Sequence, residues 1–434
     1  MGNPLINRLI NKQIIDLYSG FDDVMFTNNH VEVDGVIETV IEGKMYGESP
    51  TKTITNKFNN ILISNNIIRG SFRKVFAFGN TYGSDAIDNE GNEYTNNHSV
   101  ININNNNIIA ETYRNCIAID GFNNVKINNN TLLSKEITSD TRGILLYRNE
   151  NVDIISNTVV APLFYSYNTC YFNPELDDLN FNETNVKTIN ISKNNFINLN
   201  TTSSGLTLMV NDLTSMNGNI TIADNSFNNC TVGTFFNLTN CYGNYLSVLG
   251  NKFENCNGKL INDFSKSKII NVQDDLISSS FKKSFYISSS GSDNNYGDTN
   301  NPLLTVEEVL NRIKFIKCGT VEIIFNDNYT GNIIIEEIKN NINFTIKGRS
   351  RGIRVNGYIS VKNNNTSNLL LANFSVLNTI KNSDTNNQDT NILISNTKNV
   401  NVKYCDCNSN DNCVGINSAL GSTVIVENCT FEGK

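Results

Sequence analysis

Acidic side chains gather in one stretch of the sequence that could bind a cation. Between residues 79 and 98 lie Asp85, Asp88 and Glu90, two or three residues apart and set among glycines. Carboxylate oxygens are the ligands that Ca²⁺ prefers in proteins, so we identify these three residues as candidate calcium ligands. A solvated acidic loop without a metal would have the same composition, and the sequence leaves both interpretations open.

Aromatic rings and carboxylates are mixed in a second stretch, residues 160–185. Its candidate ligand-binding residues are Tyr165, Tyr167, Tyr171, Asp177 and Asp178. A tyrosine ring has an apolar face and a polar hydroxyl, and a carboxylate accepts hydrogen bonds from hydroxyl groups. This combination favours contact with a glycan, and a solvated loop is the alternative.

Acids and bases do not follow a pattern that predicts a catalytic site. A glycosidase needs two carboxylates a few ångströms apart, and Asp120, near the end of a predicted strand, has no obvious partner in the neighbouring segments. The two histidines, His30 and His98, lie in Asn-rich stretches, which favours surface turns over a general base. We therefore name no catalytic residue, and the sequence favours a protein without enzymatic activity.

Four of the ten cysteines occupy matching positions. Cys230 and Cys256 each follow the start of a repeated segment by ten residues, and Cys405 and Cys429 are 24 residues apart after similar Val-x-Val sequences. The members of each pair are expected to stack on neighbouring strands about 4.8 Å apart, within the Cα range of a disulfide. Stacked buried thiols, acting as small apolar groups, fit the same spacing.

A repeated eight-residue pattern must position these side chains: apolar, any, apolar, any, any, Asn, any, apolar. It starts nine times at intervals of 24 to 40 residues, the first copy being Val24-Phe26-Asn29-Val31. The first two apolar residues would face one side of a strand. Asparagine tolerates the left-handed conformation and can hydrogen-bond locally, so it would turn the chain into another short strand. Most copies then contain a third strand, such as residues 143–146.

Three short strands in about 24 residues predict one coil of a parallel β-helix, in which each coil buries its face against its neighbours. A β-sandwich would not repeat asparagine at one fixed offset. The repeated asparagines would then stack along the solenoid, and their amides would bond from coil to coil. In the ninth copy Asp275 replaces the asparagine. The other eight form a predicted structural ladder: Asn29, Asn66, Asn106, Asn130, Asn157, Asn194, Asn225 and Asn251.

Two arrays are predicted, residues 1–280 and residues 285–434, separated by the polar linker 278–284. The second array opens with a strand and a glycine-rich turn. A capping box that begins at Thr305 then predicts a short helix near residues 305–316.

The opening of the second array carries a family resemblance. Residues 285–335 contain an aromatic-Ile-Ser sequence, Gly291-Ser-Asp293, an Asn-Pro pair and the capping helix. This stretch resembles the start of right-handed parallel β-helix domains of the pectate-lyase-like superfamily. It is similar in particular to the adhesin-like surface proteins of methanogenic archaea and low-GC bacteria, and residues 424–431 resemble repeats of polymorphic outer-membrane proteins. The resemblance implies a right-handed, three-stranded solenoid and an extracellular or cell-surface location.

The composition argues against several classes of protein. Asparagine accounts for 83 of the 434 residues, but 39% of the chain is hydrophobic, so the chain is not a disordered polar tract. The formal charge of −8 argues against nucleic acid as a partner. No apolar run is long enough to predict a membrane span, and the first residues lack the blocks of a signal peptide.

The resemblance implies a cell-surface, adhesin-like structural or binding protein. It would present loops from a rigid β-helix to a glycan or to a cell-surface protein. Because the chain starts and stops within repeated segments, we also expect it to be part of a longer protein whose other segments it contacts. The main alternative is a carbohydrate-active enzyme of the same fold, a polysaccharide lyase or a glycoside hydrolase, and a phage tail-spike segment is a third class.

Overall fold

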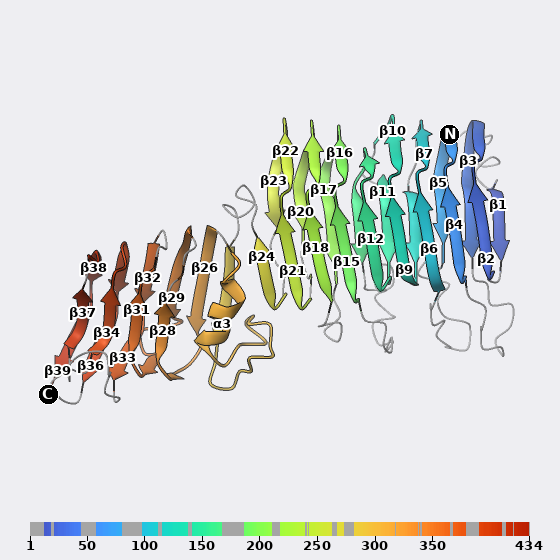
Figure 1. Cartoon of the computed structure of the whole chain (residues 1–434). Helices are drawn as coiled ribbons and strands as arrows, with labels where there is room; N and C mark the ends of the chain where they lie inside the picture. Colours follow the sequence, from blue (N-terminus) through green and yellow to red (C-terminus); the bar gives the residue numbers. More distant parts are fainter. Residues whose placement is uncertain are drawn as a thin grey trace, which may run out of the picture. The chain divides into compact units, whose positions relative to one another are not determined.

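Parallel β-strands make up most of the part of the chain that the structure describes, and α3 (Val306–Ile313) is the helix found there. The chain divides into two units, Met1–Ser265 and Lys266–Lys434. The structure is a computed structural model (Figure 1). It describes residues 13–18, 21–44, 58–79, 98–111, 115–137, 141–166, 186–210, 218–238, 241, 243–262, 267–272, 282–316, 318–336, 338, 341–364, 368–378, 390–409, 414–419 and 421–433.

The first unit contains a large parallel sheet with two limbs. Its strands are β1 (Gln13–Tyr18), β3 (His30–Lys44), β5 (Ile67–Phe78), β7 (Asn107–Ala110), β8 (Asn115–Asp120), β10 (Thr131–Ser134), β11 (Arg142–Tyr147), β13 (Thr158–Val159), β14 (Leu163–Ser166), β16 (Asn195–Ile197), β17 (Asn200–Met209), β19 (Ser226–Asn228), β20 (Thr231–Asn237), β22 (Lys252–Glu254) and β23 (Asn257–Asn262). One limb runs β7-β10-β13-β16-β19-β22 and the other runs β8-β11-β14-β17-β20-β23. The limbs meet at β5, which pairs with β7 through its first residues and with β8 through its last residues.

A second parallel sheet of the same unit stacks one strand per repeat. In order, it contains β2 (Asp23–Thr27), β4 (Asn60–Ser64), β6 (His98–Asn104), β9 (Phe122–Asn128), β12 (Asn151–Ile155), β15 (Thr188–Ser192), β18 (Asn219–Ala223) and β21 (Tyr245–Leu249). The strands pair in register, so that Ile61 lies beside Ile101 and Ile101 beside Val125. These side chains are buried, because alternate residues of a strand face the same side and the apolar set of each strand covers the next.

Three kinds of connection join these strands. The connection between the two limbs of the first sheet ranges from two residues, as between β16 and β17, to the seven residues between β10 and β11. The turn from the second sheet to the next strand of the first sheet always has two residues, as in Asn65-Asn66 between β4 and β5. The opposite connection varies from one residue, Gly121, to the 21 residues between β14 and β15. The ladder turn is therefore constant in length, and the longest insertions lie in the connection that returns to the second sheet.

The left-handed conformation falls one residue before the repeated asparagine. The residues with positive φ are the first of each two-residue turn: Asn28, Asn65, Asn105, Asn129, Ser156, Lys193, Asp224 and Gly250. The repeated asparagine is the second residue of the turn. The repeated asparagine lies in the turn, as expected, but the residue before it takes the left-handed conformation, and the asparagine amide is directed along the stack of turns.

The second unit contains β24 (Ile269–Val272) and three parallel sheets. The first sheet has β25 (Lys282–Ile287), β26 (Cys318–Phe325), β29 (Asn341–Gly348), β32 (Asn368–Ala372), β35 (Val400–Lys403) and β38 (Val424–Glu427). The second has β27 (Tyr329–Thr330), β30 (Arg354–Asn356), β33 (Ser375–Asn378), β36 (Asp406–Ser409) and β39 (Thr430–Gly433). The third has β28 (Ile333–Glu336), β31 (Ile359–Lys362), β34 (Thr390–Ser395) and β37 (Val414–Ala419).

Helix α3 begins where the capping box predicts a helix, and it ends sooner than predicted. The Thr305 hydroxyl oxygen accepts a hydrogen bond from the Glu308 N–H at 3.2 Å. Asp293 anchors the preceding turn, because its carboxylate accepts bonds from the Thr305 N–H at 2.9 Å and from the Thr305 hydroxyl at 2.8 Å. Val306 and Ile313 are buried and hold the helix against the unit.

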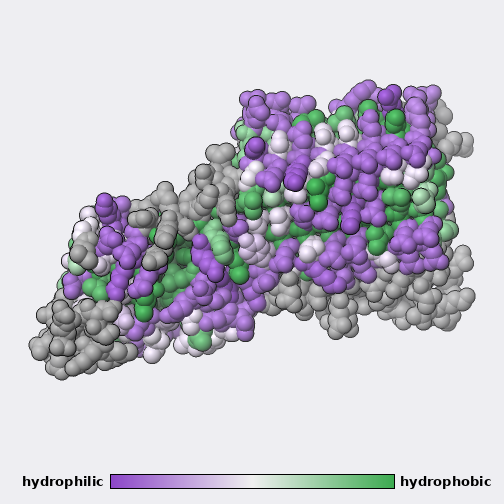
Figure 2. All heavy atoms as spheres, viewed as in Figure 1, coloured by the Kyte–Doolittle hydropathy of each residue, from purple (hydrophilic) through white to green (hydrophobic). Residues whose placement is uncertain are grey.

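The structure confirms an all-β chain of parallel strands in stacked sheets, an arrangement compatible with a β-solenoid. Part of the expected linker differs from the prediction, since Lys282, Lys283 and Ser284 already belong to β25 and pair with β26. The visible face of the first unit is mainly hydrophilic, with hydrophobic residues between rows of polar ones (Figure 2).

Candidate functional site

The asparagine ladder runs through the first unit as a continuous chain of hydrogen bonds. In each step, the side-chain Oδ1 of one asparagine accepts bonds from the backbone N–H and the Nδ2 of the asparagine one coil before it. For Asn106 and Asn130 these distances are 3.0 and 2.9 Å. The same two bonds link every neighbouring pair from Asn29 to Asn251.

A third bond ties each ladder asparagine after Asn29 to the preceding coil. The Nδ2 of Asn106 donates to the carbonyl oxygen of Ile63 at 3.0 Å, and that of Asn130 donates to Ile103 at 2.8 Å. Except for Asn29, the ladder asparagines are at most 5% exposed. Both amide hydrogens and the oxygen are satisfied, so a row of polar groups is buried without unpaired atoms. The ladder holds the turns together.

The stacked cysteines occupy an equivalent position in other turns. Cys230 and Cys256 each follow a residue with positive φ, Asn229 and Asn255. The Cys230 thiol donates to the Phe196 carbonyl at 3.5 Å, on the preceding coil, as the ladder amides do. In the structure both are thiols. Burial raises the pKa of Cys230 to about 11, and the neighbouring Cys256 adds to this shift.

His98 is buried, and the prediction that it lies in a surface turn is wrong. It is the first residue of β6 and only 2% exposed. Its imidazole lies between the rings of Phe58 and Phe122, with centroids 5.0 and 4.8 Å away, and its Nδ1 accepts the Phe58 N–H at 3.2 Å. Stacking between these two rings places His98 in the core, which could not be predicted from the polar asparagines around it in the sequence. His30, the first residue of β3, is exposed.

Asp120 forms an ion pair that was not predicted from the sequence. Both carboxylate oxygens accept hydrogen bonds from the guanidinium of Arg148, with Oδ1 2.7 Å from Nε. The side chains are 2% and 11% exposed. Burial raises the pKa of the Asp120 carboxyl, and the charge of Arg148 opposes that shift. Arg148 is not at the register position of Asp120, which pairs with Tyr147; it lies in the following turn and reaches back to the previous coil.

Two more ion pairs brace the first strands of the unit. Lys74 Nζ lies 3.4 Å from a carboxylate oxygen of Glu42, and both side chains are almost fully buried. Arg73 Nη1 lies 3.1 Å from Glu38. Each of these carboxylates faces a cation, and removing one partner of a buried pair leaves an uncompensated charge. These pairs could not be recognised from paired carboxylates in the sequence, because each joins a carboxylate on one strand to a cation on the neighbouring strand.

The outward row beside Asp120 contains apolar residues. Ala77, Ala118, Leu145, Phe164 and Thr207 occupy matching positions on neighbouring strands, in agreement with the predicted row except that Phe164 was overlooked. Thr55, also assigned to this row, lies outside the described residues. The Phe164 ring meets Tyr147 edge-on, with centroids 5.9 Å apart. Ala77 and Ala118 are buried, and Leu145, Phe164 and Thr207 are partly exposed. Together with the buried pair of Asp120, this row forms the candidate functional site of the first unit.

The predicted ligand-binding and metal-binding residues lie mostly outside the described part of the chain. Asp85, Asp88 and Glu90 belong to that group, as do Tyr167, Tyr171, Asp177 and Asp178. The backbone of Tyr165 is in β14, where it pairs with Leu146. Among the residues that the structure describes, no group of three His, Cys, Asp or Glu side chains could hold a metal ion.

No protein-family model matches the chain, and no curated protein matches its sequence. The fold and the ladder therefore define the chain only as a protein of stacked parallel sheets. Within the described residues, no helix is long and apolar enough to cross a membrane.

Proposed function

We propose that the chain is a display scaffold: two right-handed parallel β-helix arrays, with three strands in each coil, that present loops from a rigid frame. The order of strands in the second unit supports three strands per coil, because successive strands fall in three sheets in turn. The buried amide ladder supports rigidity, since its bonds join each coil of the first unit to the next.

The proposal depends on one observation, the contrast between the constant ladder turn and the variable connection that returns to the second sheet. The ladder turn always has two residues, whereas the opposite connection ranges from one residue to 21. A scaffold selected for what its loops bind needs this separation, because loops can then change in length without disturbing the stacked core. By the resemblance of residues 285–335, the scaffold is an adhesin-like protein of a cell surface, with a glycan or a cell-surface protein as its partner.

Loop replacement tests this function. In one variant, residues 80–97 and 167–185 are each replaced by a short Gly-Ser connection, and binding to a glycan panel and to intact cells is compared with that of the original chain. We expect the melting temperature to be retained and binding to be lost. Binding that persists in full after both replacements, or an original chain that binds neither cells nor glycans, contradicts the proposal.

A carbohydrate-active enzyme is the second candidate, and the pair of Asp120 and Arg148 favours it. A guanidinium can bind a carboxylate through two parallel hydrogen bonds, so Arg148 near the rings of Tyr147 and Phe164 would suit an acidic sugar. Against it, both oxygens of Asp120 are already engaged by Arg148. Cleavage of any acidic or neutral polysaccharide, abolished by Asp120→Asn in a variant that still folds, would establish the enzyme and replace the scaffold proposal.

A further inference from the structure

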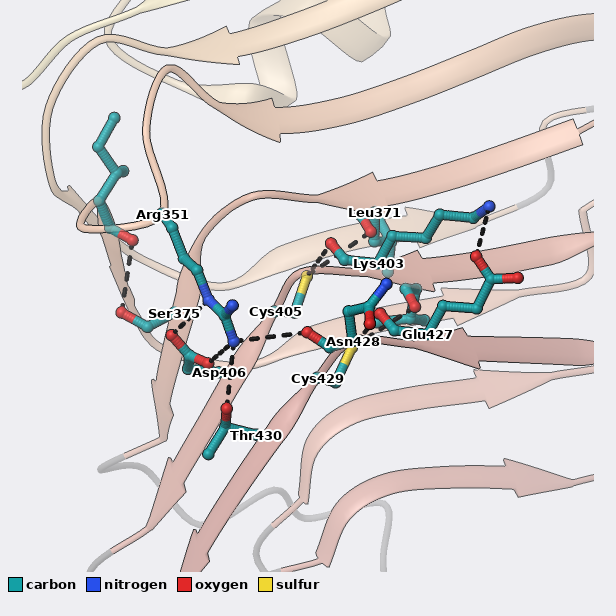
Figure 3. A network of polar contacts seen from close by, with 12 residues as sticks. Arg351, Leu371, Ser375, Lys403, Cys405, Asp406, Glu427, Asn428, Cys429 and Thr430 are labelled. Carbon is teal, nitrogen blue, oxygen red and sulfur yellow. Dashed lines mark hydrogen bonds and ion pairs between the residues drawn. The ribbon is translucent and has the colours of Figure 1, made fainter.

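Cys405 and Cys429 form a stacked pair at the last coils of the second unit. Each follows a residue with positive φ, Tyr404 and Asn428. The strands that they introduce, β36 and β39, are paired in register, and the Thr430 N–H donates to the Cys405 carbonyl at 3.0 Å. Neighbouring parallel strands are about 4.8 Å apart, so the two Cα atoms fall within the range that a disulfide spans. Figure 3 shows the two cysteine side chains on neighbouring coils.

The two thiols differ in their access to solvent. Cys405 is fully buried, and its thiol donates to the Leu371 carbonyl at 3.6 Å. Cys429 is partly exposed, and its thiol donates to the Val402 carbonyl at 3.5 Å. Burial raises the pKa of Cys405 to about 12, with a further contribution from Cys429. A reagent in solution therefore reacts with Cys429 before it reacts with Cys405.

A guanidinium lies against the residues that flank both cysteines. Arg351 donates to both carboxylate oxygens of Asp406, at 3.1 and 2.5 Å, and to the Thr430 hydroxyl at 3.1 Å. It also approaches the carbonyl of Asn428 at 3.4 Å (Figure 3). The Asp406 carboxylate contributes to the raised pKa of the Cys405 thiol, and Arg351 balances the charge of that carboxylate. Without the guanidinium, Asp406 would oppose formation of a thiolate, which is the form of cysteine that reacts.

We propose that Cys405 and Cys429 are a redox modification site, a dithiol that a small disulfide oxidant converts into a bond between two coils. The Cys429 thiolate, after releasing its proton to water, attacks one sulfur of the oxidant and forms a mixed disulfide, expelling a thiolate. Cys405 then loses its proton to that thiolate and attacks the Cys429 sulfur, expelling the second thiolate, which takes up a proton from water. The two cysteines are oxidised by two electrons, and the oxidant is reduced to two thiols.

The expected bond is readily reversible. Two stacked cysteines with the same backbone conformation keep their Cβ atoms about as far apart as the strands, slightly beyond the usual Cβ separation in a disulfide, about 3.5–4.5 Å. The bond therefore forms with a small shift of the last coil, and strained disulfides are more easily reduced than relaxed ones. This geometry suits a responsive site better than a permanent cross-link.

The test uses the native full-length chain and oxidised glutathione. After incubation, free thiols are alkylated, the chain is digested, and peptides are identified by mass. We expect a cross-linked species that contains Cys405 and Cys429, has lost two hydrogens, and disappears on reduction. Cys407→Ser should keep this bond and Cys429→Ser should abolish it. Native protein in which Cys405 stays open to alkylation, or in which Cys429 bonds to Cys407, would overturn the proposal.

The contribution of Arg351 has its own control within the chain. Arg351→Gln should slow formation of the Cys405–Cys429 bond by about threefold to tenfold, and Arg351→Lys should restore much of the rate. The Cys230–Cys256 pair stacks in the same way in the first unit, so its oxidation rate should not change in either variant. Equal slowing of both pairs, or no slowing at 405–429, shows that Arg351 does not activate the dithiol. Circular dichroism establishes that each variant is folded.

Discussion

Replacing Asn130 with alanine tests the ladder most directly. The carboxamide oxygen of Asn130 accepts two bonds from Asn106, one from its backbone N–H and one from its Nδ2. The variant leaves both donors buried without an acceptor, because Asn106 is 1% exposed. Each unsatisfied donor costs about 1–2 kcal/mol, and the lost packing adds about 1 kcal/mol. We therefore expect the free energy of unfolding to fall by about 3–5 kcal/mol.

Asn29→Ala provides a control from the same ladder. Asn29 stands at its first position and donates to Asn66 through its backbone N–H and its Nδ2. After the substitution, the Asn66 oxygen still accepts the backbone N–H, so no donor becomes unsatisfied. The expected loss is about 1 kcal/mol or less. Asn60→Ala, which removes an exposed bond to Asp23, should cost a similarly small amount.

The measurement combines urea unfolding with hydrogen exchange. Solenoids can open coil by coil, so a global midpoint alone could miss a local effect. Exchange at the backbone amide of Asn106 should accelerate in Asn130→Ala and stay slow in Asn29→Ala. If the Asn130 and Asn29 variants lose stability equally, or if the Asn106 amide stays protected in both, the account of the ladder is wrong.

Three further predictions concern other positions. Gly79→Ala should lower the unfolding free energy by about 3 kcal/mol or more, because φ is +87° and a Cβ would overlap a neighbouring carbonyl oxygen. Gly35→Ala, at φ +91° with open space around it, should lower it by only about 1 kcal/mol. Equal losses of unfolding free energy in urea would contradict this. His98→Phe should lower the unfolding free energy by about 1–3 kcal/mol, because a buried backbone amide loses its acceptor, and a fully stable variant would refute that. The hydrogen bond from Arg351 lowers the pKa of Asp406, so this pair stabilises the fold above the unfolded carboxyl pKa of about 4 and loses that contribution as pH falls through the lower folded pKa. The difference in unfolding free energy between the original chain and Arg351→Gln should therefore shrink in acid. A difference that does not depend on pH would count against this prediction.

Much of the fold follows from local sequence patterns. The spacing of apolar residues and asparagine identifies the short strands, because it depends only on which face of a strand each residue occupies. The same spacing predicts that Asn106 and Asn130 stack. It does not tell which residue of the turn takes the left-handed conformation, since Asn129 and Asn130 are the same amino acid and only the three-dimensional turn distinguishes them.

The candidate site was harder to predict, because its contacts join different coils. Asp120 and Arg148 are 28 residues apart, and Arg148 lies in a turn and not in a strand. A search by strand register alone compares Asp120 with Tyr147 and misses its neighbour. His98 was misplaced for a related reason: its sequence neighbours are polar, whereas its actual neighbours are the rings of Phe58 and Phe122, which occupy the same position in adjacent coils.

The constant two-residue turn makes each coil of the first unit a genetic module. Every ladder bond joins one turn to the next, whatever number of residues separates them along the chain. Duplicating a segment from one turn to the next, such as the 24 residues between Asn106 and Asn130, would lengthen the array by one step of about 4.8 Å and leave every other register unchanged. Whole coils can thus be gained, lost or exchanged by recombination, and protein engineers can set the length of the array in the same steps.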